Sequence, residues 1–183
     1  MACNLSAGRN EVCKESIGGI QGVYFINYTT GSFTKDANGV VTALPASSSL
    51  YYYQLKGNNS NYTETVNSSR DNGTTFFSQQ LVLNLKKLTN EMTTQLKLMA
   101  YGRPQILVWT NNGDTLLVGE KLGADVTAGT IQTGGALGDL YGYSVTFTGM
   151  EQLPAAFISG STTSTGIPTS VLNGGTIVYG TNN

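Results

Sequence analysis

The sequence predicts a mainly β fold, a β-sandwich or open barrel with one short α-helix at its flank. Two long stretches, 74–86 and 141–148, alternate between apolar and polar residues with the period of two that is typical of a β-strand. One further stretch, 88–100, repeats its apolar residues at helical spacing instead. The chain has 183 residues, which is the length of one domain that can bury a hydrophobic core.

Three short strands are expected in the first third of the sequence, after a break at Gly18-Gly19. Their ranges are 23–28, 40–44 and 50–55. The first of these strands is apolar at consecutive positions, so both of its faces should be covered. Residues 29–39 end in Asn38-Gly39 and are expected to form a loop.

A long antiparallel hairpin is predicted next, from strands at 62–68 and 74–86. The connection SSRDNG contains Asn72-Gly73, a pair that favours a tight reversal between strands. The second strand places one apolar face toward a core, interrupted by Gln79. The apolar residues of that face are Phe77, Leu81, Leu83 and Leu85.

The pattern then changes to a single helical stripe. The stripe consists of Leu88, Met92, Leu96 and Met99. Thr89 or Asn90 is expected to cap the start of the helix, and Gly102 is expected to end it in a left-handed conformation. Pro104 prevents continuation. A helix this short, with threonines at its centre, must pack against a sheet to be stable.

The second half of the sequence predicts a hairpin of 105–109 with 115–118, a possible strand at 126–132, and a glycine-rich turn at 134–139. The strand after this turn sorts its residues onto two faces. Tyr141, Tyr143, Val145 and Phe147 share the apolar face, and Gly142, Ser144, Thr146 and Thr148 share the small and polar face.

The domain organisation follows from changes in composition. Residues 1–18 are polar and irregular and are expected to form an N-terminal arm, and 19–158 form the β domain. Residues 159–183 are predicted to be a flexible C-terminal extension, because 159–166 is rich in Ser, Thr and Gly. A strand at 176–179 is expected to pair only with a partner chain.

The charge content is unusually low. Charged residues make up 11% of the sequence, against the ~25% of typical soluble proteins, and the net charge is −1. After Lys121 the chain has no cation and only the acids Asp125, Asp139 and Glu151. Such a region would not grip phosphates and could let DNA slide past. Chance composition of a polar tail explains the same pattern equally well.

Catalytic and metal-binding motifs are not evident. The sequence has no histidine, which excludes Ser-His-Asp and Cys-His catalysis and histidine-containing metal sites. Cys3 and Cys13 are expected to be free thiols, although they could pair. We therefore predict no catalytic residue, metal or cofactor, and no membrane span. A small hydrolase that uses Asp125, Asp139 and Glu151 is the remaining enzymatic hypothesis.

Three segments together span most of residues 1–158: CNLSAGRNEVCKESIGGIQGVYFINY, GRPQILVWTNNGDTLLVGEKLGADVT and GDLYGYSVTFTGMEQLPA. These segments resemble virion structural proteins of tailed phages, particularly those of Bacteroidetes hosts. The order of elements also resembles the phage tail tube family. This resemblance implies a non-catalytic subunit that forms stacked, usually hexameric rings, with inner sheets that join between subunits around a DNA channel. The extra residues after Pro154 and the short loop at 56–61 depart from that family.

The resemblance implies assembly in the host cytoplasm and location in the virion tail. The implied partners are further copies of the chain, a tape measure, a tail terminator or neck and, in a contractile tail, the sheath, while DNA passes through without specific binding. Ring contacts are expected from strand edges, 56–61, 1–18 and 159–183. One alternative is a neck, stopper or other virion ring protein. A second is a carbohydrate-binding, adhesin-like β-sandwich, because the ten tyrosines could stack on sugars.

Overall fold

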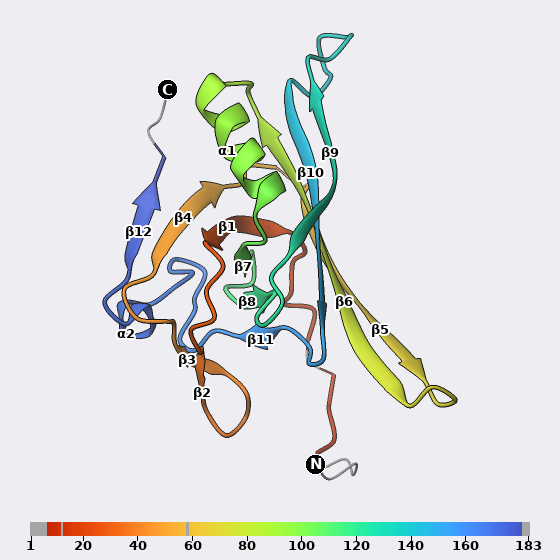
Figure 1. The fold of residues 1–183 in the computed structure, drawn as a ribbon, viewed down its shortest axis with the longest axis vertical. Coiled ribbons are helices and arrows are strands. Elements are labelled where there is room, and N and C mark those ends of the chain that lie inside the picture. The colour runs from red at the N-terminus through yellow and green to blue at the C-terminus, as the bar shows by residue number, and fades with distance from the viewer. Residues whose placement is uncertain (1–6, 12, 58, 181–183) are drawn as a thin grey trace.

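The computed structural model, which describes residues 7–11, 13–57 and 59–180, has the predicted mainly β, sandwich-like architecture (Figure 1). A six-stranded sheet lies in the middle of the molecule. A four-stranded sheet packs on one of its faces, and a layer of loops, a small hairpin and the C-terminal segment covers the other. Neither sheet closes into a barrel within the described residues.

The six-stranded sheet has the order β11-β8-β7-β1-β4-β12. Its strands are β1 (Ile20–Ile26), β4 (Ser49–Gln54), β7 (Gln105–Thr110), β8 (Thr115–Val118), β11 (Ala156–Phe157) and β12 (Thr176–Tyr179). The central strands β1 and β7 are buried on both faces, as their consecutive apolar residues predict. The hairpin of β7 with β8 is confirmed.

The four-stranded sheet has the order β5-β6-β10-β9, and all of its neighbours are antiparallel. Its strands are β5 (Asn61–Ser69), β6 (Thr74–Lys86), β9 (Asp125–Gln132) and β10 (Gly142–Glu151). The predicted hairpin of β5 with β6 is confirmed. Gly73 in its turn has φ of 63°, a conformation that favours glycine.

Two hydrophobic clusters hold the layers together. The first fills the space between the sheets, where Leu81, Leu83 and Val145 of the four-stranded sheet meet β1 and β7. Phe25 of β1 and Phe147 of β10 contact each other there, with ring centroids 5.3 Å apart. The predicted alternation of both long strands is therefore the packing pattern of this core.

The second cluster covers the opposite face of the six-stranded sheet, and the elements that supply this cover were not predicted. The loop expected at 29–39 contributes β2 (Thr34–Lys35), which pairs with β3 (Val41–Ala43). A one-turn helix, α2 (Thr169–Leu172), places Val171 in this cluster.

The C-terminal segment belongs to this covering layer, which corrects two predictions. The residues 159–166, expected to be a flexible linker, are tied to the sheet: Thr162 O accepts a 2.9 Å hydrogen bond from Trp109 Nε1, and Gly166 O accepts one of 2.7 Å from Thr115 Oγ1. The expectation that β12 pairs only with a partner chain is wrong, because β12 pairs in parallel with β4 of its own chain.

The predicted helix is α1 (Asn90–Tyr101), capped by Thr89, whose Oγ1 accepts from the amide of Met92 at 3.1 Å. Its stripe packs, half-buried, against the core between the sheets. The prediction that Gly102 ends the helix in a left-handed conformation is wrong. Gly102 is extended, with φ −93° and ψ 177°, because the chain runs on directly into β7. Neither helix of the described residues has the length and hydropathy that a membrane crossing requires.

The expected N-terminal arm is largely exposed over its described residues. The amide of Ile17 donates to Asn112 Oδ1 at 2.9 Å, which holds the end of the arm against the β7–β8 turn. Cys13 is an exposed free thiol, and Cys3 lies outside the described residues.

Candidate functional site

The four-stranded sheet presents one face that no other layer covers, and we call it the outer face. Because side chains alternate along a strand, the residues between the buried positions of β6 and β10 point away from the core. On β5 and β6 these are Asn61, Thr63, Thr65, Asn67, Ser69, Thr74, Phe76, Ser78, Gln80, Val82, Asn84 and Lys86. On β9 and β10 they are Asp125, Thr127, Ala128, Thr130, Gln132, Ser144, Thr146, Thr148 and Met150. The neighbours Thr127 and Ala128 share this face because a β-bulge in β9 interrupts the alternation there.

The outer face is polar but almost free of charge. Among these strand residues the only ionisable ones are Lys86 and Asp125. Most of the others carry hydroxyl or amide groups, and some bond to one another, as Thr127 Oγ1 does with Thr148 Oγ1 at 2.9 Å. A surface of this kind can hydrogen-bond to water, but it carries hardly any fixed charge that could attract or repel a polyanion.

Both edges of this sheet are open within the described residues. β5 and β9 each pair on one side only, so nine-residue and eight-residue strands present unpaired backbone groups at either edge. Neither strand contains Lys, Arg or Pro, which commonly protect an exposed edge, although β9 has a β-bulge at Thr127. The Glu64 side chain of β5 is directed inward, where it accepts a hydrogen bond from Gln79.

The two open edges are displaced along the strand direction. β5 lies opposite residues 74–82 of β6. β9 lies, through β10, at the level of residues 80–86 of β6. The midpoints of the two edge strands therefore differ by about five residues, or about 16 Å at the rise of a β-strand. In Figure 1 the β5–β6 hairpin accordingly projects at one end of the molecule and the β9–β10 hairpin at the other.

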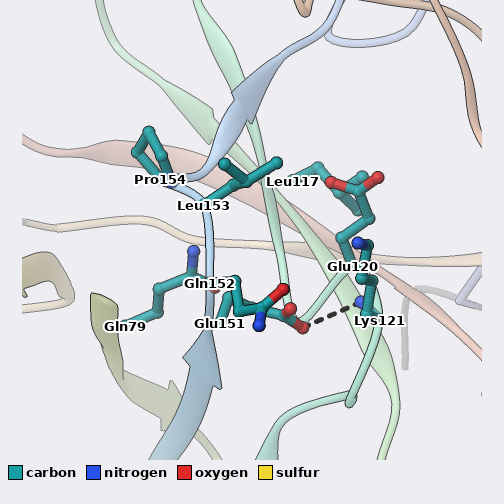
Figure 2. Close-up of a pocket in the computed structure, with 8 residues that line it drawn as sticks. All are labelled: Gln79, Leu117, Glu120, Lys121, Glu151, Gln152, Leu153 and Pro154. Carbon is teal, nitrogen blue, oxygen red and sulfur yellow. Dashed lines mark hydrogen bonds between the residues drawn. The ribbon is translucent and has the colours of Figure 1, made fainter. Parts of the chain in front are cut away.

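A small polar pocket lies between the end of β10 and the loop that joins β8 to β9 (Figure 2). Glu151, buried at the end of β10, accepts hydrogen bonds on Oε1 from the amides of Lys121 and Leu122, both at 2.8 Å. Glu120 beside it pairs with Lys35 Nζ at 2.5 Å. The cavity volume is about 10 Å³, which is the space of one water molecule. The hydrogen bonds to Glu151 therefore hold the β8–β9 loop in place, and the pocket is too small for a substrate.

The three acids of the hydrolase hypothesis do not share a site. Asp139 lies in the turn before β10 and Glu151 at the far end of that strand, which is about 30 Å long. Asp125 lies opposite Thr148 on the outer face, whereas Glu151 is buried on the other face. The described residues contain no group of three acids or cysteines placed to hold a metal ion.

Asp139 instead organises the glycine-rich turn. Its Oδ2 accepts from the amides of Ala136 at 2.7 Å and Gly135 at 2.9 Å. These hydrogen bonds stabilise the carboxylate and lower the pKa of Asp139 below its usual value. The turn presents Leu137 as a fully exposed side chain at the tip of the β9–β10 hairpin.

The structure describes only part of the segments that were expected to make ring contacts. The loop 56–61 lies beside the start of β5, with Ser60 buried and bonded to the amide of Asn84; residue 58 lies outside the described residues. Residues 1–6, 12 and 181–183 of the two expected terminal contact segments also lie outside them.

Sequence reasoning identified the strands of the four-stranded sheet but not its outer face as a site. The signal was present in the uncharged polar residues at every second position of 61–69 and 144–148. It becomes interpretable only when four strands are placed side by side. Comparison of the chain with protein-family models, with curated proteins and with solved structures finds no match.

Proposed function

We propose that the protein is a structural ring subunit of a phage virion, a tail tube protein, whose four-stranded sheet continues from copy to copy around a channel. The observation that carries the proposal is the pair of open sheet edges, β5 and β9, together with their displacement. Unpaired strands of this length favour the addition of a further strand.

The strand directions allow this addition in a head-to-tail ring. Because each neighbouring pair in β5-β6-β10-β9 is antiparallel, β5 and β9 run in opposite directions. A rotation that brings β9 of one copy beside β5 of the next therefore makes one more antiparallel pair. Such a contact uses two different surfaces and repeats until the ring closes.

The displacement between the edges supports closure of that ring into a barrel. Aligning β9 with β5 of the next copy shifts the register by about five residues for every four strands. A shift of about 16 Å over a width of about 19 Å corresponds to a strand tilt of about 40°. This tilt lies within the range of about 35–45° found in closed barrels, and it does not depend on the number of copies.

In this arrangement the outer face of the sheet lines the channel. Six copies of the four-stranded sheet would enclose a barrel about 48 Å across between backbones, for strands about 4.8 Å apart and tilted by about 40°. The nearly uncharged lining would let DNA pass without specific binding, because few counterions are exchanged for protein contacts. The six-stranded sheet and the covering layer would lie outside.

The proposed location is the virion tail, with assembly in the host cytoplasm. The proposed partners are neighbouring copies, a tape measure, a terminator or neck and, in a contractile tail, the sheath. The same edges suit a neck or stopper ring. The stacking of rings distinguishes the two assignments, because a tube subunit forms filaments whereas a neck or stopper subunit stops at one ring.

Negative-stain electron microscopy of the purified chain over a range of concentrations tests the proposal. The expected result is rings that stack into hollow filaments at high concentration. Single rings at every concentration would favour the neck or stopper assignment. A monomer at all concentrations and salt conditions, or a dimer closed by two β5 edges, would contradict the proposal.

A further inference from the structure

A second site lies away from the outer face, in a groove between α1 and the strands β1 and β4. Its cavity volume is about 350 Å³. This volume falls within the range of about 300–1,000 Å³ that is typical of small-molecule sites. None of the residues that line the groove belongs to β5 or β9, so the groove is independent of the proposed ring contact.

One wall of the groove is made of three tyrosine rings, two of which are held by contacts with the rest of the fold. Tyr53 packs edge-on against the buried ring of Phe25, with centroids 5.1 Å apart and planes at 84°. The hydroxyl of Tyr28 donates to the carbonyl of Lys121 at 2.8 Å. Tyr51 remains exposed beside them. Because Tyr28 and Tyr53 are already oriented, a ligand that contacts them has little of their conformational entropy to remove.

The opposite wall is formed by α1, whose apolar surface remains exposed there. Leu98 is 59% exposed although it faces a groove that Met99 and Pro104 also line. This apolar wall and the tyrosines line the same cavity, so a ligand bound there would contact both.

The rim of the groove carries hydrogen-bonding groups that are free to engage a ligand. The side-chain amides of Asn27 and Gln95 have no hydrogen-bond partner within the described part of the chain. The guanidinium of Arg103 lies 4.2 Å from the centre of the Tyr28 ring, which fixes its position. Each amide can donate and accept, whereas the guanidinium only donates.

We propose that this groove binds a neutral carbohydrate, a hexopyranose unit of a glycan. The apolar C–H face of the sugar ring would stack on the exposed Tyr51, and its hydroxyls would bond to Asn27, Gln95 and Arg103. Hydroxyl groups need partners that both donate and accept, and the two amides meet this need. A single cation at the rim does not match a polyanionic ligand. The site binds and carries out no reaction.

A glycan array probed with the full chain, followed by calorimetric titration of the best neutral oligosaccharide, tests this inference. Tyr51→Ala and Gln95→Leu should each weaken binding by at least about tenfold while leaving the melting temperature close to that of the unchanged protein. Tyr101→Ala is the matched control, because Tyr101 is an exposed tyrosine of α1 outside the groove, and its replacement should leave affinity unchanged.

Three outcomes would overturn the inference. The first is that no neutral glycan is bound on the array. The second is binding that all three variants weaken equally. The third is a peptide from a displayed library that occupies the groove and that no sugar displaces. Each of these results is independent of ring formation, because the array reads binding whether or not the chain assembles.

Discussion

The side-chain amide of Gln79 joins two strands and a loop beneath the four-stranded sheet. Its Nε2 donates to Glu64 Oε1 at 3.0 Å, and its Oε1 accepts from the amide of Gly119 at 2.9 Å. Glu64 Oε1 also accepts from the amide of Ala155 at 3.0 Å. Gln79 is 1% exposed, so the residue that interrupts the apolar stripe of β6 is a buried connector whose polar groups are satisfied.

Replacing Gln79 with Ala should destabilise the protein by about 2–3 kcal/mol. The change leaves the buried Gly119 amide without its side-chain partner, removes one of the hydrogen bonds to the half-buried Glu64 carboxylate, and opens a cavity. Urea unfolding followed by circular dichroism measures the loss. Gln80→Ala is the control, because Gln80 is exposed on the outer face, and it should change stability by less than about 0.5 kcal/mol. Equal losses for both variants would contradict the role of Gln79.

Replacing Thr89 with Ala should cost about 1 kcal/mol. Thr89 Oγ1 accepts from the Met92 amide, and the variant leaves that amide at the start of α1 without a side-chain partner. Thr94→Ala is a matched change inside the helix, where the hydroxyl only bonds back to the carbonyl of Asn90 and alanine has the higher helix propensity. Thermal unfolding should rank Thr89→Ala well below Thr94→Ala, and the reverse order would contradict the cap.

Gly166→Ala should destabilise the packing of the C-terminal segment on the six-stranded sheet by about 1–3 kcal/mol. A Cβ at this position would lie 2.8 Å from Trp109 Cδ2 and 2.8 Å from the hydroxyl oxygen of Tyr24. Trp109 is the single tryptophan of the sequence, so its fluorescence reports the change directly and should shift toward longer wavelength. Gly180→Ala, where a Cβ meets nothing, is the control. An unchanged spectrum in Gly166→Ala would contradict the contact.

Stability should fall as the pH rises above about 10. Burial, with smaller contributions from the charges of Glu91 and Tyr51, raises the pKa of Tyr53 to about 12. The unfolded phenol ionises near pH 10, so between these values the unfolded state binds fewer protons than the native state, and stability decreases with pH. Burial raises the pKa of Tyr24 in the same direction.

Urea unfolding from pH 8 to pH 11.5 should therefore show a decline above pH 10 that is shallower in Tyr53→Phe. The two proteins are compared with their own values at pH 8, where the phenol is neutral in both states. Identical slopes above pH 10 would contradict the assignment of this effect to Tyr53.

The proposed ring contact predicts a specific disulfide between copies. Thr65 lies at the middle of β5 and Ala128 near the middle of β9, and both belong to the outer face. In a background with Cys3→Ser and Cys13→Ser, Thr65→Cys combined with Ala128→Cys should give a ladder of linked oligomers on a non-reducing gel, because facing strands bring Cα atoms within disulfide range.

The matched control combines Thr65→Cys with Thr42→Cys. Thr42 is exposed on β3, in the layer on the far side of the six-stranded sheet. This pair should stay unlinked under the same oxidation. A ladder from the control pair, or none from the Thr65 and Ala128 pair, would contradict the proposed junction.

The sequence by itself determined the β-rich class, the long hairpin of β5 with β6, the two-faced strand β10 and the capped helix α1. Each of these depends on neighbours in the sequence, since alternation, turn chemistry and capping act over a few residues. Only the tertiary structure decided where the C-terminal segment packs and which strand it pairs with. The parallel pairing of β12 with β4 joins residues that lie more than a hundred positions apart, and no local pattern encodes it.

The same division applies to the candidate sites. The low charge of the outer face was visible as composition, but the displacement of β5 from β9 arises from registers that run across four strands. The groove likewise takes Tyr51, Gln95 and Arg103 from a strand, a helix and a connecting segment. Local sequence sets which way each side chain faces along its own element, whereas long-range packing sets which elements become neighbours.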